Sequence, residues 1–107
     1  MRSPQPPVFA ALTACVAACH ECFAGSLAEP GAAALGRGIQ LSRDCAELCQ
    51  LVAGFVARGA EHTPYLLRAG AELCRACADE VTQYPYDYTR RCAEACRQAE
   101  DACRTAY

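Results

Sequence analysis

The chain has 107 residues, 53% of them apolar, which is enough for one compact domain with a sizeable core. Its 10 basic residues, all of them arginine, nearly balance 12 acidic residues, so the formal net charge is −2. No basic stretch offers a face for phosphate groups, and this excludes nucleic acid as a main partner.

Proline and glycine divide the chain into four predicted helices. After a short N-terminal tail over residues 1–7, a first helix is expected over residues 8–28, and Pro30 in the following turn ends it. A second helix is expected over residues 32–58, although two glycines weaken its first turns. Gly59 is well placed to cap its C-terminus.

The third and fourth predicted helices have clear start and stop signals. Thr63 followed by Pro64 predicts a capped start for the third helix, and Tyr84 ends it because the residue before Pro85 disfavours helix. Asp87 is the expected cap of the fourth helix, which continues to the C-terminus.

Four helices of similar length with short connections predict an all-α fold. The simplest arrangement is an antiparallel four-helix bundle over residues 8–107, with the cysteines lining its core.

The first predicted helix also raises the question of export. Arg2 and the apolar run after it resemble a signal peptide, but three prolines occupy the first seven positions and cysteines recur at helical spacing within the run. We expect no apolar stretch to approach the roughly 20 residues that span a bilayer. The sequence therefore predicts a cytoplasmic protein without membrane contact, in which thiols stay reduced.

Ten cysteines recur mostly three or four residues apart, so each predicted helix presents one stripe of thiols. Folding the chain back at its three connections brings the four stripes together in the middle of the bundle. Cys15, Cys45, Cys77 and Cys92 are expected at nearly one level, and Cys103 lies furthest toward one end. The candidate thiolate ligands are Cys15, Cys19, Cys22, Cys45, Cys49, Cys74, Cys77, Cys92, Cys96 and Cys103.

This thiol pattern favours a soft metal. Thiolates suit Cu(I), zinc and iron–sulfur clusters, but zinc and iron–sulfur sites usually take four ligands from knuckles or loops. Cu(I) accepts two or three sulfurs and shares bridging thiolates, so a ladder of thiols along straight helices fits several Cu(I) ions better. Two alternatives stay open at this point. The cysteines could be small core hydrophobes, or they could form disulfides between helices.

The segments "CHECF", "DCAELCQL", "AELCRACADE" and "CAEACRQAEDACR" resemble the cytosolic copper storage proteins, from about residue 8 to residue 107. The resemblance implies a bundle that holds several Cu(I) ions for storage, buffering or delivery, with a copper-donating or copper-accepting protein as a partner. Members of the family are usually richer in cysteine, so we expect a cysteine-depleted member with reduced capacity. Other residues occupy the positions where the ladders would continue: Val8, Leu12, Ser26, Gly38, Leu67, Gly70, Val81, Thr89 and Ala99.

No enzyme motif stands out, so an enzymatic activity is not favoured. The alternative function is a metal-dependent redox enzyme or electron carrier on the same bundle, with Tyr84, Tyr86 and Tyr88 near its centre. These tyrosines are predicted to cap the hydrophobic end of the bundle; a gating or reactive role at the mouth of the metal site is the second interpretation. His20 and His62 are expected outside the ligand set. The sequence does not predict an oligomeric state.

Overall fold

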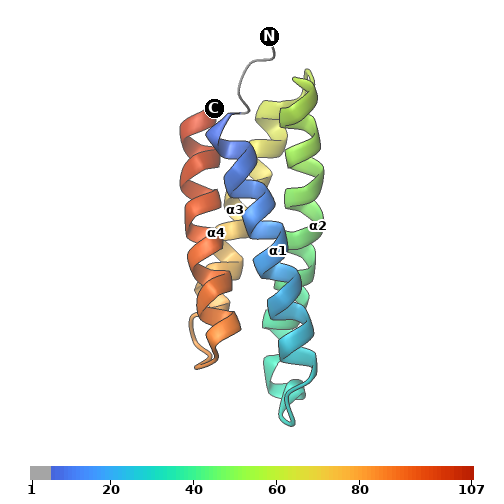
Figure 1. The fold of residues 1–107 in the computed structure, drawn as a ribbon, viewed down its shortest axis with the longest axis vertical. Coiled ribbons are helices and arrows are strands. Elements are labelled where there is room, and N and C mark those ends of the chain that lie inside the picture. Colours follow the sequence, from blue (N-terminus) through green and yellow to red (C-terminus); the bar gives the residue numbers. More distant parts are fainter. Residues whose placement is uncertain (1–5) are drawn as a thin grey trace.

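Four antiparallel helices run side by side in the computed structural model, which describes residues 6–107 (Figure 1). Residues 6–107 contain no strand. The predicted antiparallel four-helix bundle is confirmed. The elements in chain order are α1 (Pro7–Leu27), the 3₁₀ helix η1 (Ala32–Leu35), α2 (Gly36–Arg58), α3 (Thr63–Val81) and α4 (Asp87–Ala106).

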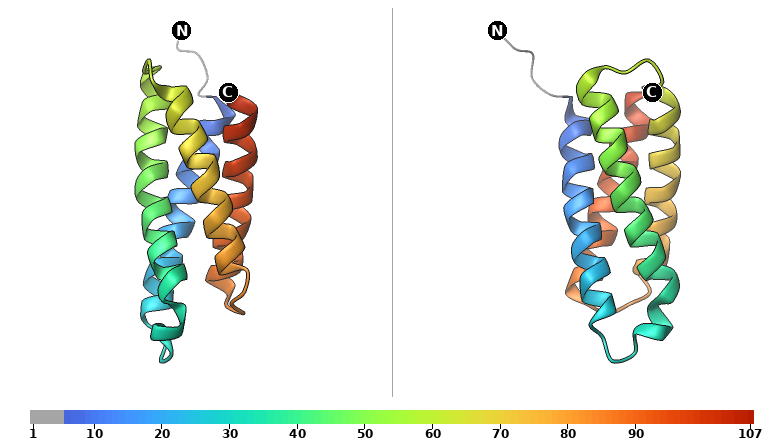
Figure 2. Two further views of the ribbon diagram at one scale, coloured as in Figure 1. Left: turned by 180° about the vertical axis from the view of Figure 1, so that it is seen from behind. Right: turned by 90° about the vertical axis from the view of Figure 1, so that its right-hand side faces the viewer.

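The helices form a ring in which α1 and α3 each pack against both α2 and α4. Figure 2 shows this ring from behind and from the side. The start of α1 and the end of α4 lie together at one end of the bundle, which we call the terminal end (Figure 1). The opposite end carries the α1–α2 connection and the turn from α3 to α4 around Tyr84–Tyr88, and we call it the tyrosine end. The α1–α2 connection projects beyond the α3–α4 turn there (Figure 1).

The helix boundaries agree with the predicted signals to within a few residues. Helix α1 begins at Pro7, and the tail predicted over residues 1–7 lies mostly outside the described residues. The expected second helix is divided, because its first turn is the 3₁₀ helix η1 and α2 begins only at Gly36. The predicted caps Thr63 and Asp87 are instead the first residues of α3 and α4. A shift of one residue at a helix end is within ordinary variation.

Gly59 caps α2 as predicted, and its backbone is left-handed with φ of 63°. We expect Gly59→Ala to lower the free energy of unfolding by about 1 kcal/mol, because a Cβ is strained at positive φ. Urea unfolding followed by circular dichroism measures the change. Gly36→Ala is the matched control, since Gly36 has helical angles and nothing within 4 Å of the added Cβ. This control is expected to be neutral or stabilising, and an equal loss in both variants would contradict the argument.

The core is built from small side chains. All ten cysteines are 0% exposed and are joined by alanines and a few aliphatic residues. Small residues on every inward stripe place the helices close together, so side chains from all four helices meet along one axis. Every buried side-chain nitrogen or oxygen among the described residues has a hydrogen-bond partner.

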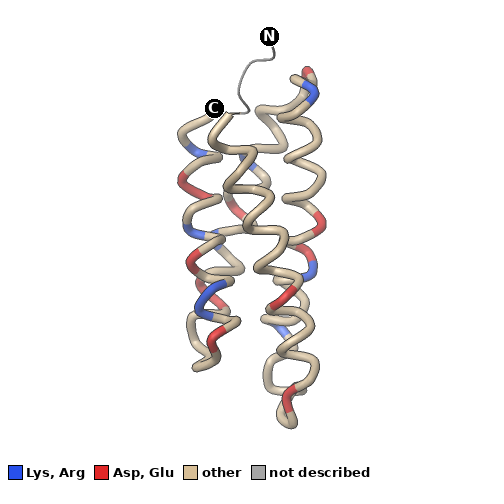
Figure 3. Tube along the Cα trace, in the orientation of Figure 1, with Lys and Arg blue, Asp and Glu red and all other residues tan. Residues whose placement is uncertain are grey.

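Helix α1 corrects one expectation. It has 21 residues with a mean hydropathy of 1.6 over its most apolar 18-residue window, so by length and composition it could cross a membrane. The expectation that no stretch is long and apolar enough is therefore wrong. Core helices of soluble proteins and signal sequences reach the same values. Glu21 is the one charged residue in α1, whereas acidic and basic residues alternate along α4 (Figure 3).

Candidate metal centre

Eight of the ten thiols form a continuous group in the middle of the bundle, and we call them the central thiols. Each helix contributes two of them from positions three or four residues apart, which project from one face of a helix. The central thiols are Cys15 and Cys19 of α1, Cys45 and Cys49 of α2, Cys74 and Cys77 of α3, and Cys92 and Cys96 of α4.

The central thiols contact one another across helix boundaries. Sγ–Sγ distances are 3.6 Å between Cys49 and Cys74, 3.7 Å between Cys45 and Cys74, and 3.7 Å between Cys15 and Cys96. These are van der Waals and hydrogen-bond distances, well beyond the roughly 2.05 Å of a disulfide. All ten cysteines are free thiols in the structure. Cross-helix disulfides are therefore not what holds this core together.

The central thiols divide into three overlapping groups of four. Within each group all four sulfurs lie within 4.8 Å of one another. The middle group shares two members with each of the other groups, so the sulfur array has no gap. The groups are Cys15, Cys45, Cys49 and Cys74; Cys15, Cys19, Cys45 and Cys96; and Cys19, Cys77, Cys92 and Cys96.

The levels of the thiols differ from the expected ones by about one helical turn. Cys15 was expected beside Cys77 and Cys92, but its sulfur lies 4.0 Å from Cys74 and 3.7 Å from Cys96. Levels depend on where each connection reverses the chain, and three or four residues correspond to one turn. The four stripes converge as predicted, but α3 and α4 are displaced along the bundle axis relative to their expected positions beside α1.

Cys22 and Cys103 lie at opposite ends of the array and belong to none of the three groups. The Cys22 sulfur lies 3.9 Å from the Ser26 hydroxyl, on the side of the tyrosine end. Cys103 lies on the other side, where a Cβ added to Gly70 would be 3.8 Å from its sulfur. The central thiols are therefore flanked by one further thiol on each side.

Burial and sulfur contacts act on the pKa of these thiols in different ways. Burial raises the pKa of Cys103 to about 12. Within the array, hydrogen bonds from Cys19 and other thiols lower the pKa of Cys15 despite its burial. Hydrogen bonds from Cys19 and Cys22 similarly lower the pKa of Cys92 to about 6. A hydrogen bond to Cys15 raises the pKa of Cys45. Hydrogen bonds between the thiols therefore favour the thiolate form at some sulfurs and the protonated form at their neighbours.

This donor set fits Cu(I). It consists of soft sulfurs alone, enclosed in a core from which carboxylates and histidines are absent among the described residues. Each Cu(I) that binds displaces thiol protons and cancels one thiolate charge, so a polynuclear array stays nearly neutral in a low-dielectric interior. The contacts of 3.6 to 4.0 Å between sulfurs allow one sulfur to serve two ions.

The histidines and tyrosines lie outside the thiol array. His20 and His62 are exposed. The Tyr88 hydroxyl donates to Glu29, and the Tyr84 hydroxyl donates to Glu80 at 2.6 Å. Burial and the bond to Glu29 raise the pKa of Tyr88. The bond to Glu80 likewise raises the pKa of Tyr84. Both tyrosines cover the tyrosine end.

Two features of the core at this end were not predicted from the sequence. Ser42 is 0% exposed and donates to the Gly38 carbonyl at 2.7 Å. It stands three residues before Cys45, so the thiol spacing could have identified it as an inward position. Gly25 lies directly against the ring of Tyr88. This contact has no local signal, because α1 and α4 are far apart in the chain.

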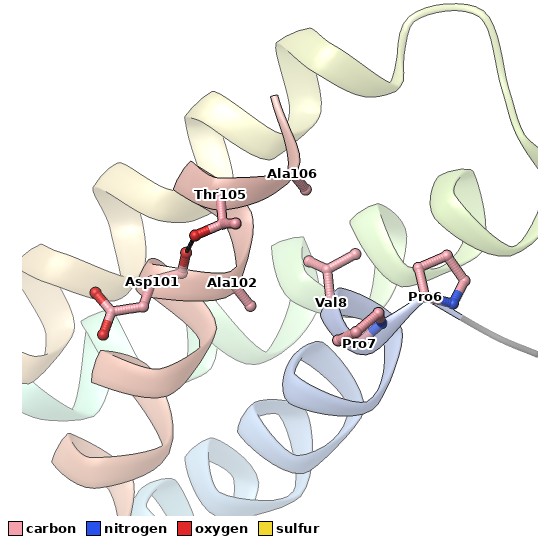
Figure 4. Close-up of a pocket in the computed structure, with 7 residues that line it drawn as sticks. All are labelled: Pro6, Pro7, Val8, Asp101, Ala102, Thr105 and Ala106. Carbon is pink, nitrogen blue, oxygen red and sulfur yellow. Dashed lines mark hydrogen bonds between the residues drawn. The ribbon is translucent and has the colours of Figure 1, made fainter.

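A separate cavity of ≈ 570 Å³ lies at the terminal end between α1 and α4 (Figure 4). It is largely apolar, and none of the cysteines lines it. It is therefore distinct from the thiol array. Its lining residues are Pro6, Pro7, Val8, Asp101, Ala102, Thr105 and Ala106.

Comparisons with known proteins agree with this geometry. The family model of the copper storage proteins matches residues 2–107. An uncharacterised cysteine-rich protein of Bacillus subtilis, YhjQ, is 30% identical over 91 residues, which are 85% of this chain and 84% of that protein.

Two solved structures share the fold. The Cu(I)-bound copper storage protein BsCsp3 of Bacillus subtilis has a TM-score of 0.88 and 28% identity, with 92% of each chain covered. A cytosolic copper storage protein from Streptomyces lividans with five coppers has a TM-score of 0.88 and 35% identity, covering 92% of this chain and 87% of that one.

Proposed function

Because the chain belongs to the copper storage protein family, we propose that it binds several Cu(I) ions through the thiolates of its buried cysteines. The observation that carries this proposal is the continuous array of eight central thiols, with all four helices contributing two sulfurs each. Copper is the cargo of this core, and its uptake, buffering and return to other proteins are the activity.

The proposed ligand set contains all ten cysteines, in two classes. The eight central thiols form the main store, because every one of them has three neighbouring sulfurs within 4.8 Å. Cys22 and Cys103 are proposed as additional ligands on the two flanks. The ladders end where Leu12, Leu67 and Val81 fill the core, so we propose a lower capacity than that of a bundle with thiols along its whole length.

We place this activity in the cytoplasm. The Streptomyces lividans relative is described as cytosolic, and a reducing compartment keeps thiols available as ligands. A copper-donating or copper-accepting protein is the proposed partner, since a buried cargo must be exchanged with other carriers. The alternative function, a metal-dependent redox enzyme or electron carrier, is not favoured by the thiol array or by the relatives.

Anaerobic titration with Cu(I), followed by native mass spectrometry, tests the proposal. We expect the wild-type protein to take up several ions and to release protons as thiols become thiolates. The uptake should weaken as the pH falls, because protons compete with Cu(I) for the sulfurs. Protein whose cysteines have been alkylated under denaturing conditions is the control and should bind none. Binding of no more than one ion by the wild-type protein would contradict a polynuclear store.

A further inference from the structure

The two ends of the bundle core differ in chemistry. At the terminal end the core is filled by the aliphatic side chains of Val8, Leu12, Val52 and Leu67, which are at most 5% exposed. The buried polar side chains of the described residues, Ser26, Ser42 and Thr89, all lie toward the tyrosine end. Val81 is also buried at the tyrosine end. Among the described residues, however, an ion that moves between solvent and the thiols meets buried hydroxyl groups only at this end.

Tyr88 closes the seam between α1 and α4 at the tyrosine end. A Cβ added to Gly25 would lie 2.8 Å from the Tyr88 ring, so the ring lies directly on the α1 backbone. Its hydroxyl donates to Glu29, which follows α1, and its ring stacks on Tyr86 at a centroid distance of 5.2 Å. Gly25 lies three residues after Cys22, so this ring covers α1 almost one helical turn beyond that thiol.

Tyr84 closes the opposite seam, between α2 and α3, in the same way. A Cβ added to Gly38 would lie 3.2 Å from the Tyr84 ring. The Tyr84 hydroxyl donates to Glu80, which also pairs with Arg37 of α2 at 3.2 Å. Each seam is thus covered by a tyrosine that lies on a glycine of the neighbouring helix and is held by a glutamate.

The two closures differ in what opening them requires. Tyr84 bonds to Glu80, four residues away in its own segment, so this bond does not itself join two helices. Tyr88 bonds to Glu29, 59 residues away in the chain, so the bond ties the start of α4 to the end of α1. Opening the α1–α4 seam must therefore break the Tyr88–Glu29 bond.

From these contacts we propose that Tyr88, latched to Glu29 over Gly25 and assisted by Tyr84, is a gate through which Cu(I) passes to and from the thiols, with Cys22 as the first sulfur inside. The proposal rests on the proposed Cu(I) binding. It adds the side chains of this chain that set the rate of exchange at the tyrosine end.

Transfer of Cu(I) from the loaded protein to excess bathocuproine disulfonate tests the gate. We expect Tyr88→Ala to speed transfer by about tenfold, the order expected when a hydrogen bond to a charged group is lost, while the number of bound ions stays unchanged. Tyr65→Ala is the matched control, because Tyr65 is an exposed tyrosine at the terminal end; its transfer rate should equal that of the wild type. An unchanged rate in Tyr88→Ala, or equal acceleration in Tyr65→Ala, would overturn the gate.

A second measurement needs no copper. In the reduced, metal-free protein, maleimide labelling followed by peptide mass spectrometry should modify Cys22 faster in Tyr88→Ala than in the wild type, with Cys103 unchanged. Glu29→Gln keeps the Tyr88 ring and weakens its hydrogen bond, so we expect a smaller acceleration of Cys22 labelling. This variant tests the gate if Tyr88→Ala does not fold. Equal labelling of Cys22 in these variants and the wild type would refute the gate. Failure of the wild-type protein to bind Cu(I) would instead refute the proposed function.

Discussion

Replacing both Cys15 and Cys96 with alanine is expected to remove more than half of the bound Cu(I). Both residues belong to the middle group of thiols, and each is also a member of one flanking group, so the double substitution leaves no group of four intact. Their sulfurs lie 3.7 Å apart, where α1 and α4 meet. Bridging between neighbouring ions depends on shared sulfurs, and the remaining thiols would hold ions singly or in pairs.

The matched control is the double variant Cys22→Ala with Cys103→Ala. It removes the same number of fully buried thiols, but both lie outside the three groups. We expect this control to lose at most about two Cu(I) ions, one for each thiol removed. Native mass spectrometry after Cu(I) titration gives the number of bound ions in both double variants. Each Cys→Ala change opens a small cavity of similar size, so circular dichroism should show comparable folding in the two variants. Equal Cu(I) numbers in both would contradict a store centred on the shared sulfurs.

Loading with Cu(I) is expected to raise the melting temperature of the wild-type protein by about 15 °C or more. A shift of this size is expected for a domain of about 100 residues when the free Cu(I) concentration is about 1,000 times the dissociation constant. The physical reason is that the folded bundle brings sulfurs from four helices within 4.8 Å, whereas the unfolded chain holds them apart. Unfolded cysteines also bind Cu(I), and this lowers the shift without reversing it.

Thermal unfolding of the apo and loaded forms under anaerobic conditions measures the shift. The variant lacking the Cys15 and Cys96 thiols should show a much smaller increase, because its array is interrupted. The stabilisation should also shrink as the pH falls, since protons displace Cu(I) from thiolates. Equal melting temperatures of the apo and loaded wild-type protein would mean that copper binds outside the folded core.

Local signals predicted most of the architecture. The thiol stripes follow from helical periodicity, and all ten cysteines are buried where that periodicity points them. Pro30 and Pro85 lie in the predicted connections, and Gly59 has the left-handed conformation expected of a cap. These features depend on neighbours within one or two turns, so a single sequence contains the information they need.

Contacts between distant segments were harder to predict. The displacement of α3 and α4 by about one turn depends on the geometry of the connections, including the 3₁₀ helix η1 that replaces the first turn of the expected second helix. Tyr84 and Tyr88 were predicted to cover one end of the bundle. The close contacts of their rings with Gly38 and Gly25 were not predicted. Such contacts depend on how whole helices pack, and no spacing within one helix encodes them.

Four amphipathic helices whose cysteines share one interior could be predicted from the sequence, because apolar and thiol residues recur with the period of a helix. Which sulfurs are neighbours, and which end of the bundle has buried polar side chains, became clear from the packed helices alone. Those properties depend on axial register, which a change of a few residues in any turn shifts by a full 5.4 Å pitch.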